Sequence, residues 1–248
     1  MKKILFFTSA RSDYGLLKPL IRKSKEFFDV YLLVSGSHFL RSKGYTFDEI
    51  YEDGILEESK IFKISAFSEE HDVKNLGIGV GESIKLISEI FSENLFDAVI
   101  ILGDRYELFS VTFPALMYKI PVFHISGGEI TEGVIDDSVR HATTKLSHIH
   151  LVANETYAEN VSLMGEEDWR INIVGENGLD NIYIKDISSK EYIFEKFGIN
   201  LNKESILVTY HPSTLESISP ENQIKPLINV LKKYTDKLVS EKVFDEKF

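Results

Sequence analysis

Short apolar runs that alternate with longer mixed segments constrain the fold of this chain more than any other feature. Continuous apolar runs of this length are typical of strands that are covered on both faces. Strands that alternate with helices predict parallel βαβ units with right-handed crossovers, so we expect a doubly wound α/β domain. The expected strands are Lys3–Thr8, Val30–Val34, Lys60–Ile64, Ala98–Leu102, Val122–Ile125, Ile149–Ala153 and Ile171–Val174.

The segments between these runs have the apolar spacing of helices. Val80, Ile84 and Ile87, for example, repeat along one face of an expected helix. The turn Ser9–Tyr14 is expected to be a loop that leads into the first helix. The expected helices are about Leu16–Phe28, Asn75–Leu95, Glu107–Tyr118, Asp136–Ser147 and Glu155–Met164.

The composition changes after Gly175, where a polar connection begins. We predict a first domain over residues 1–175 and the start of a second domain over residues 176–248. In the second, the sequence predicts helices over Ser188–Phe197 and about Glu221–Tyr234, and a strand over Ser205–Tyr210. One strand and two or three helices do not make a doubly wound sheet, so this domain is expected to be incomplete.

Charge and cysteine content exclude several classes of function. The net charge is -11 and no basic run stands out, so nucleic acid is not an expected partner. The absence of cysteine excludes disulfides and thiol catalysis, and it suits a cytoplasmic protein. No run approaches the ~20 apolar residues of a membrane span. The run Ile4–Phe7 is too short for a signal peptide, so a buried strand is expected there.

The candidate active site lies where two neighbouring strands end. Asp104 follows one apolar run after a glycine, Glu129 follows the next after two glycines, and Asp136 and Asp137 begin the following helix. Ligands of open parallel sheets bind outside the carboxyl ends of the strands. Carboxylates that face one cleft repel each other, which raises a pKa and creates an acid–base pair. A reaction that removes a proton from carbon and returns one needs such a pair.

Structural roles stay open for each of these acids. Asp104 would also suit the N-cap of the next helix. Glu129 would also suit the solvated side chain of a tight turn. The helix dipole alone favours acids at a helix start, which would explain one of Asp136 and Asp137.

Other polar residues lie at expected strand ends. Arg11 and Asp13 occupy the first strand–helix turn, which often meets a nucleotide or phosphate in doubly wound folds. His38 follows a Ser-Gly-Ser loop and is a candidate ligand contact. Arg105 would hold a phosphate or pair with a neighbouring acid. His211, which precedes a proline, is the strongest candidate for a catalytic histidine.

The remaining histidines favour structural roles. His141, His148 and His150 lack tight ligand spacing, so core or capping roles are favoured over a metal site. His124 lies inside an apolar run and is expected to be structural. The chain has no glycine-rich P-loop, no G-x-S-x-G elbow and no dinucleotide motif. ATP hydrolysis, esterase chemistry and NAD use are therefore disfavoured.

Five motifs stand in a specific order over about residues 1–215. They are RSDYGLL from Arg11, GDR from Gly103, GGE from Gly127, DDSVRHATTKLSH from Asp136, and YHP from Tyr210. In combination they resemble the hydrolysing UDP-N-acetylglucosamine 2-epimerases. The similarity points to the branch of bacterial sialic-acid and legionaminic-acid biosynthesis.

The resemblance implies two Rossmann-like domains of the glycosyltransferase-B type, with a nucleotide sugar in the cleft. It implies elimination of the nucleoside diphosphate to a glycal and hydration with inversion at C2. The product is a free N-acetylmannosamine-type sugar, and neither metal nor NAD is required. For the full-length family, the resemblance also implies a homo-oligomer, either a dimer or a tetramer. By position, the catalytic residues would be Asp104, Asp136 and His211, and the substrate-binding residues Arg11, Asp13, His38, Arg105, Ser126 and Asp137.

The sequence departs from the family pattern in three places. Some relatives carry a catalytic glutamate where Ser126 stands, and because serine cannot serve as that acid, Glu129 is the expected catalytic substitute. Asn177 stands where the linker of relatives usually has a proline. Family members continue well past residue 248, so we expect this chain alone to have little or no activity.

Two other classes of function stay open. A non-catalytic remnant would bind a nucleotide sugar or pair with a full-length subunit. A glycosyltransferase of the same architecture would explain the fold but not the acids from Glu129 to Asp137. The sugar also stays open among UDP-N-acetylglucosamine, its GDP counterpart and a 2,4-diacetamido-6-deoxy UDP-sugar.

Overall fold

The structure is a computed structural model, which describes residues 1–70, 72–183, 189–201, 206, 208–213 and 217–233. The chain forms two compact units. The first comprises Met1–Glu132 and Asp136–Asn181, and the second Gly133–Ile135 and Ile182–Phe248. The candidate acids belong to the first unit, whereas His211 belongs to the second.

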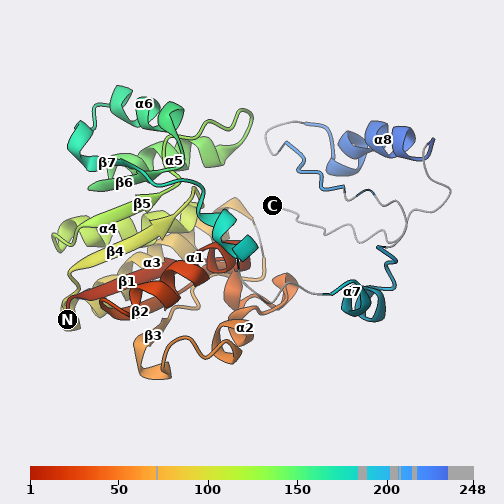
Figure 1. Cartoon of the computed structure of the whole chain (residues 1–248). Helices are drawn as coiled ribbons and strands as arrows, with labels where there is room; N and C mark the ends of the chain where they lie inside the picture. The colour runs from red at the N-terminus through yellow and green to blue at the C-terminus, as the bar shows by residue number, and fades with distance from the viewer. Residues whose placement is uncertain (71, 184–188, 202–205, 207, 214–216, 234–248) are drawn as a thin grey trace. The chain divides into compact units, whose positions relative to one another are not determined.

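A seven-stranded parallel sheet forms the centre of the first unit (Figure 1). Its order is β3-β2-β1-β4-β5-β6-β7, so the chain winds outward from β1 in one direction and then, from β4, in the other. All neighbouring strands are parallel. The predicted doubly wound α/β fold is confirmed, and each of the seven strands expected in the first domain agrees within one residue at either end. The strands are β1 Lys3–Thr8, β2 Asp29–Val34, β3 Ile61–Lys63, β4 Ala98–Leu102, β5 Val122–Ile125, β6 Ile149–Val152 and β7 Ile171–Ile173.

Helices cover both faces of this sheet, and each face has its own apolar core. Because successive side chains of a strand point to opposite faces, β1 contributes to both cores. Phe6 packs in one core with Leu17, and Phe7 packs in the other with Ile87 and Phe91. The helices are α1 Arg11–Ser24, α2 Phe47–Glu52, α3 Val73–Glu93, α4 Phe109–Met117, α5 Ile135–Lys145 and α6 Glu155–Leu163.

The first helix begins earlier than we predicted. α1 starts at Arg11, so the expected loop Ser9–Tyr14 is wrong for its last four residues. The reason is the side chain of Asp13, whose carboxylate accepts hydrogen bonds from the backbone N–H groups of Ser9 and Ala10 at 3.1 and 3.0 Å. These bonds fix the first helical turn directly after β1.

The second unit contains two helices among its described residues. α7 Lys190–Phe197 lies within the predicted helix Ser188–Phe197, and α8 Pro220–Leu231 begins one residue before the predicted helix of about Glu221–Tyr234. Ser188 and Tyr234 are outside the described ranges. The strand predicted over Ser205–Tyr210 is wrong for its described residues, because Ile206 and residues 208–210 have no regular structure. Ile206 is 70 % exposed. A strand needs a neighbouring strand for its backbone hydrogen bonds, and the described part of this unit provides none.

The connection between the sheet and the second unit begins against α1. Asn177 starts a short 3-10 helix, Asn177–Tyr183. The side-chain amide of Asn177 donates a hydrogen bond to the carbonyl of Leu16 at 2.5 Å, and that of Asn181 donates to the carbonyl of Gly15 at 3.3 Å. Among the described residues, no helix is long and apolar enough to cross a membrane.

Candidate functional site

The carboxyl ends of β4 and β5 are tied together where the candidate acids begin. The N–H of Gly103 donates to the carbonyl of Ile125 at 3.0 Å, and Nε2 of His124 lies 2.7 Å from the carbonyl of Gly103. Gly103 has φ +82°, a left-handed conformation that glycine adopts without strain. The chain turns sharply there, so that Asp104 follows directly at the edge of the sheet.

The loop after β5 is held in a demanding backbone conformation. Ser126 has φ +62°, which costs a residue with a side chain about 1–3 kcal/mol. Gly128 has φ +80°, and a Cβ there would stand 2.3 Å from the carbonyl oxygen of Tyr157. The side-chain amide of Asn160 donates to the carbonyl of Gly128 at 2.8 Å. The second glycine of the GGE motif, Gly128, is therefore required by its close approach to α6. Glu129 leaves this tight turn half-buried.

Arg140 joins the two strand ends from α5. Its Nη2 forms an ion pair with Oδ2 of Asp104, and its Nη1 donates to the carbonyl of Glu129 at 3.0 Å and to Oγ1 of Thr131 at 3.1 Å. Oδ1 of Asp137 lies 3.6 Å from the same Nη1. Arg140 is 4 % exposed. Sequence reasoning missed this residue, although its spacing offered a signal, because positions three and four before it on the helix are both aspartates.

The acids of this edge have partners that differ from simple helix caps. No side chain caps the helical turn after Asp104 or α4, so the N-cap alternative for Asp104 is wrong. Asp137 accepts a hydrogen bond from the N–H of Thr131 at 2.8 Å, which closes the loop before α5. Asp136 and Asp137 both lie in the first turn of α5, as expected.

Burial and neighbouring charges shift two of these carboxyls in the same direction. Burial raises the pKa of Glu129, Arg140 lowers it, and Glu176 and Asp104 raise it further. Burial and the charge of Asp104 raise the pKa of Asp136, while Arg105 and Arg140 oppose that shift. Three acids thus share one electrostatic environment at the carboxyl ends of β4 and β5. A raised pKa suits a carboxyl that exchanges protons near neutral pH.

Two of the three guanidinium nitrogens of Arg105 have an internal partner. Its Nε and Nη2 lie 3.2 and 2.9 Å from the two carboxylate oxygens of Glu107, which is 1 % exposed. A forked pair of this kind fixes the guanidinium plane. Of the two roles expected for Arg105, phosphate binding and pairing with a neighbouring acid, the structure shows the ion pair. Its partner Glu107 is a further residue that sequence reasoning missed.

Two residues of the β1 and β2 ends have structural partners. The carboxylate of Asp13 is 7 % exposed and accepts from Ser9 and Ala10, as described above. His38 is fully buried, with Nε2 2.9 Å from Oγ1 of Thr8 and Nδ1 2.8 Å from Oγ1 of Thr46. Burial, aided by the charge of Arg105, lowers the pKa of His38 to about 4. The predicted ligand contact therefore finds no free atom on His38.

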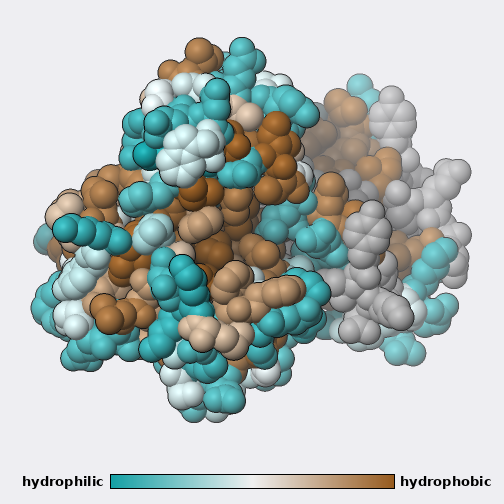
Figure 2. All heavy atoms as spheres, turned by 60° about the vertical axis from the view of Figure 1, so that its left-hand side comes forward, coloured by the Kyte–Doolittle hydropathy of each residue, from teal (hydrophilic) through white to brown (hydrophobic). Residues whose placement is uncertain are grey.

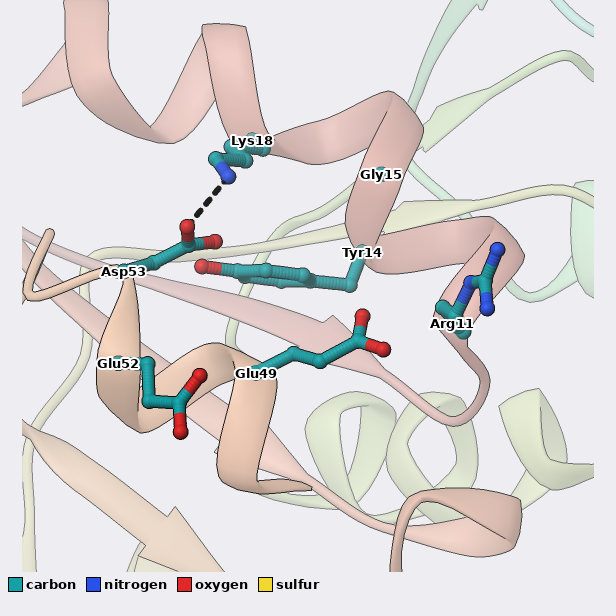
Figure 3. A pocket seen from close by; sticks show the side chains of 7 residues that line it. All are labelled: Arg11, Tyr14, Gly15, Lys18, Glu49, Glu52 and Asp53. Atoms are coloured by element: carbon teal, nitrogen blue, oxygen red, sulfur yellow. Dashed lines mark hydrogen bonds and ion pairs between the residues drawn. The ribbon is translucent and has the colours of Figure 1, made fainter. Parts of the chain in front are cut away.

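Arg11 faces a pocket between α1 and α2 (Figure 3). The pocket has a volume of about 360 Å³. Two of its lining residues, Lys18 and Asp53, form an ion pair at 2.5 Å. Burial together with Asp53 raises the pKa of Tyr14. The lining residues of the pocket are Arg11, Tyr14, Gly15, Lys18, Glu49, Glu52 and Asp53.

The histidines outside this edge have separate surroundings. His211 is exposed, in a segment of the second unit without regular structure. His124 is buried, as expected, and burial lowers its pKa to about 4. Nδ1 of His148 accepts from the N–H of Val122 at 3.2 Å, and Nε2 of the buried His150 lies 3.1 Å from Oε2 of Glu166. His141 lies 3.5 Å from Asp137.

Fold and site together define a Rossmann-like α/β protein with a carboxylate site at the carboxyl edge of its sheet. The chain belongs to the UDP-N-acetylglucosamine 2-epimerase family, whose family model matches residues 21–243. It is 34% identical over 235 residues to the polysialic acid biosynthesis protein P7 of Escherichia coli. It is 33% identical over 233 residues to the hydrolysing GDP/UDP-N,N'-diacetylbacillosamine 2-epimerase of Campylobacter jejuni. Each alignment covers 93% of this chain and 59% of the relative.

Solved structures share the fold. The UDP-GlcNAc 2-epimerase of Methanocaldococcus jannaschii has a TM-score of 0.63 and 20% identity, over 80% of this chain and 54% of that structure. The Neisseria meningitidis UDP-GlcNAc 2-epimerase, solved with UDP-GlcNAc bound, has a TM-score of 0.64 and 17% identity over the same shares. These structures confirm the predicted fold of the glycosyltransferase-B type, and the chain spans little more than half of their length.

Proposed function

We propose that this chain supplies the acidic half of a hydrolysing nucleotide-sugar 2-epimerase site. The substrate is UDP-N-acetylglucosamine or a related UDP- or GDP-linked 2-acetamido sugar. With water it yields a nucleoside diphosphate and a free sugar of the N-acetylmannosamine type. The observation that carries the proposal is the group of Asp104, Glu129 and Asp136 around one buried arginine in a chain of this family.

The chemistry of the reaction matches a group of carboxyls. A base removes the proton from C2, the electrons form the C1–C2 double bond, and the bond from C1 to the diphosphate oxygen breaks. Water then adds its oxygen to C1 of the glycal, and an acid delivers a proton to the opposite face of C2. Each half couples one proton transfer at C2 to the cleavage or formation of a C–O bond at C1, and no hydride moves, so the proposed reaction uses no NAD; by resemblance to the family it uses no metal either. Asp104, Asp136 and Glu129 are the proposed acids and bases, with His211 as a fourth catalytic group.

Glu129 is proposed to replace the glutamate that some relatives carry at the position of Ser126. A serine hydroxyl cannot act as a carboxylic acid. The carboxyl of Glu129 is half-buried, and burial together with Glu176 and Asp104 raises its pKa despite Arg140. Such a carboxyl keeps its proton at higher pH than an exposed glutamate and therefore suits the acid of the second half-reaction.

The proposed substrate-binding residues follow the family pattern, except that Asp13 and His38 have structural roles. Arg11, Arg105, Ser126 and Asp137 are proposed to contact the substrate directly. Asp13 and His38 are buried and hydrogen-bonded, so their contribution is to hold the ends of β1 and β2.

The chain is also proposed to form a homo-oligomer in the cytoplasm. Helix α4 is apolar on both sides, and its residues Phe113, Leu116 and Met117 are 47, 38 and 57 % exposed. Apolar side chains gather on one face of the molecule in Figure 2. An exposed apolar helix face is typical of a protein–protein contact. Sedimentation of wild type and Phe113→Asp tests this proposal, since only wild type should associate.

Titration of UDP-N-acetylglucosamine against the purified chain in deuterated water, with detection of UDP and free sugar, tests the reaction. Release of UDP together with a sugar carrying deuterium at C2 supports the epimerase, and Glu129→Gln should abolish that release. Efficient release would also overturn the expectation that this chain alone has little or no activity. Near-normal turnover by Glu129→Gln would contradict the role of that residue. Since the chain spans 59% of its curated relatives, saturable binding without release supports the alternative of a binding remnant. If the chain neither binds the nucleotide sugar nor releases UDP, both functions are overturned.

A further inference from the structure

Arg140 lies in the interior of the first unit with its charge surrounded by acids. It is 4 % exposed and extends from the second turn of α5, one helical turn beyond Asp136. Its two terminal nitrogens reach three chain segments: the end of β4 at Asp104, the loop after β5 at Glu129 and Thr131, and its own helix at Asp137. A buried guanidinium with this many partners restricts the position of all of them.

We propose that Arg140 is a positioning residue that holds Asp104 and the Glu129–Asp137 loop in one arrangement, so that the carboxyls of Asp104, Glu129 and Asp136 face the same space. The proposal rests on the proposed function for the use of these carboxyls. It concerns the geometry of the site, which is measurable without turnover.

The loop is fixed at both of its ends. The carbonyl of Glu129 accepts from Nη1 of Arg140 at 3.0 Å, and the N–H of Thr131 donates to Oδ1 of Asp137 at 2.8 Å. The hydroxyl of Thr131 lies 3.1 Å from the same Nη1. A lysine ammonium is a single point charge, so it lacks the fork that reaches a carboxylate and a carbonyl on separate segments.

Arg140 also balances the charge of the acids. The charged groups that face Glu129 are Arg140, Glu176 and Asp104, and those that face Asp136 are Asp104, Arg105 and Arg140. Arg105 already forms a forked pair with the buried Glu107. Removal of the Arg140 charge therefore leaves the acids under mutual repulsion, and loss of the Asp104 charge relieves that repulsion.

Carboxyl titrations by ¹³C NMR test the charge balance in the full chain. In Arg140→Gln we expect the pKa of Glu129 and of Asp136 to rise by about one pH unit relative to wild type. In Asp104→Asn we expect both values to fall. Arg170→Gln is the matched control, because Arg170 pairs with Glu166 and Glu167 and does not face either carboxyl.

Amide hydrogen exchange at Thr131 tests the positioning itself. Arg140→Lys keeps the charge but loses the fork, so exchange at Thr131 should accelerate at least about tenfold while the two carboxyl pKa values stay near those of wild type. Unchanged exchange in Arg140→Lys would overturn the positioning role. Unchanged carboxyl titrations in Asp104→Asn would overturn the charge balance even if Arg140→Gln does not fold. Because none of these readouts needs substrate, a failed turnover assay and a failed positioning role are distinguishable.

Discussion

Single residues at the strand ends show how narrowly the loop after β5 is specified. Gly128 combines φ +80° with a carbonyl oxygen 2.3 Å from the place of a Cβ. Gly128→Ala should therefore destabilise the chain by at least about 2 kcal/mol, from backbone strain and from displacement of α6. Gly165→Ala is the control, since its φ is +88° but no atom lies within 4 Å of its Cβ position. Urea unfolding measures both variants, and equal losses would contradict the close approach.

Two of the three fully buried histidines among the described residues, His38 and His124, predict acid sensitivity. Burial lowers the pKa of His38 and of His124 to about 4, from 6.5 in the unfolded chain. The folded chain thus favours the neutral rings, and this stability is fully present above pH 6.5 and is lost as the pH falls towards 4. For each ring, acidification from pH 7 to pH 5 should lower the free energy of unfolding by about 2 kcal/mol. His38→Gln, which cannot titrate, should lose less stability on acidification than wild type, and an equal loss would contradict the buried neutral ring.

The site residues differ in how far the sequence could reveal them. Asp104, Glu129 and Asp136 were predictable because each follows an apolar run or opens a helix, so the topology alone brings them to one edge. The partners of those residues were not predictable. Arg140 and Glu107 lie within helical segments, where charged side chains are usually exposed, and only the packed structure shows that both are buried.

At the level of elements, the strands were the most predictable part. Their apolar runs are short and continuous, and no helix of the same length would bury them equally well. The prediction placed the start of α1 by its apolar repeat and therefore missed the first turn. That turn is fixed instead by the carboxylate of Asp13, which accepts hydrogen bonds from the N–H groups of Ser9 and Ala10 just before the helix. The expected strand near Tyr210 failed because an apolar run forms a strand only beside another strand.

The start of α1 gives a prediction about one element. Asp13→Ala leaves the buried N–H groups of Ser9 and Ala10 without an acceptor, which should cost about 1–3 kcal/mol and fray the first turn of α1. Hydrogen exchange over residues 11–16 measures the fraying. Ser12→Ala is the control, because its hydroxyl donates to the same carboxylate at 3.2 Å but supports no backbone group. Equal exchange in the two variants would show that the cap does not hold the turn.

At the scale of the whole molecule, stability is concentrated in the first unit. Both apolar cores, with their fully buried side chains, lie among residues 4–125. The described residues of α7 and α8 include none that is buried. The connection at Asn177 and Asn181 bonds to α1 and so belongs with the sheet. Hydrophobic burial is the main source of folding free energy, so the second unit should add little to it.

A fragment of residues 1–181 should therefore unfold with the same midpoint and cooperativity as the 248-residue chain. Limited proteolysis of the full chain should leave a resistant product that ends shortly after Asn181, and not at the domain boundary that the sequence predicts near Gly175. Cleavage needs local opening of the chain. Asn177 and Asn181 oppose that opening because they bind the segment to α1. A fragment that ends at Gly165 is the control, since it lacks β7, loses one side of the β6 ladder and removes Glu166 from the buried His150. A lower midpoint for residues 1–181 than for the full chain would show that the second unit stabilises the sheet, and it would assign residues 182–248 a structural role.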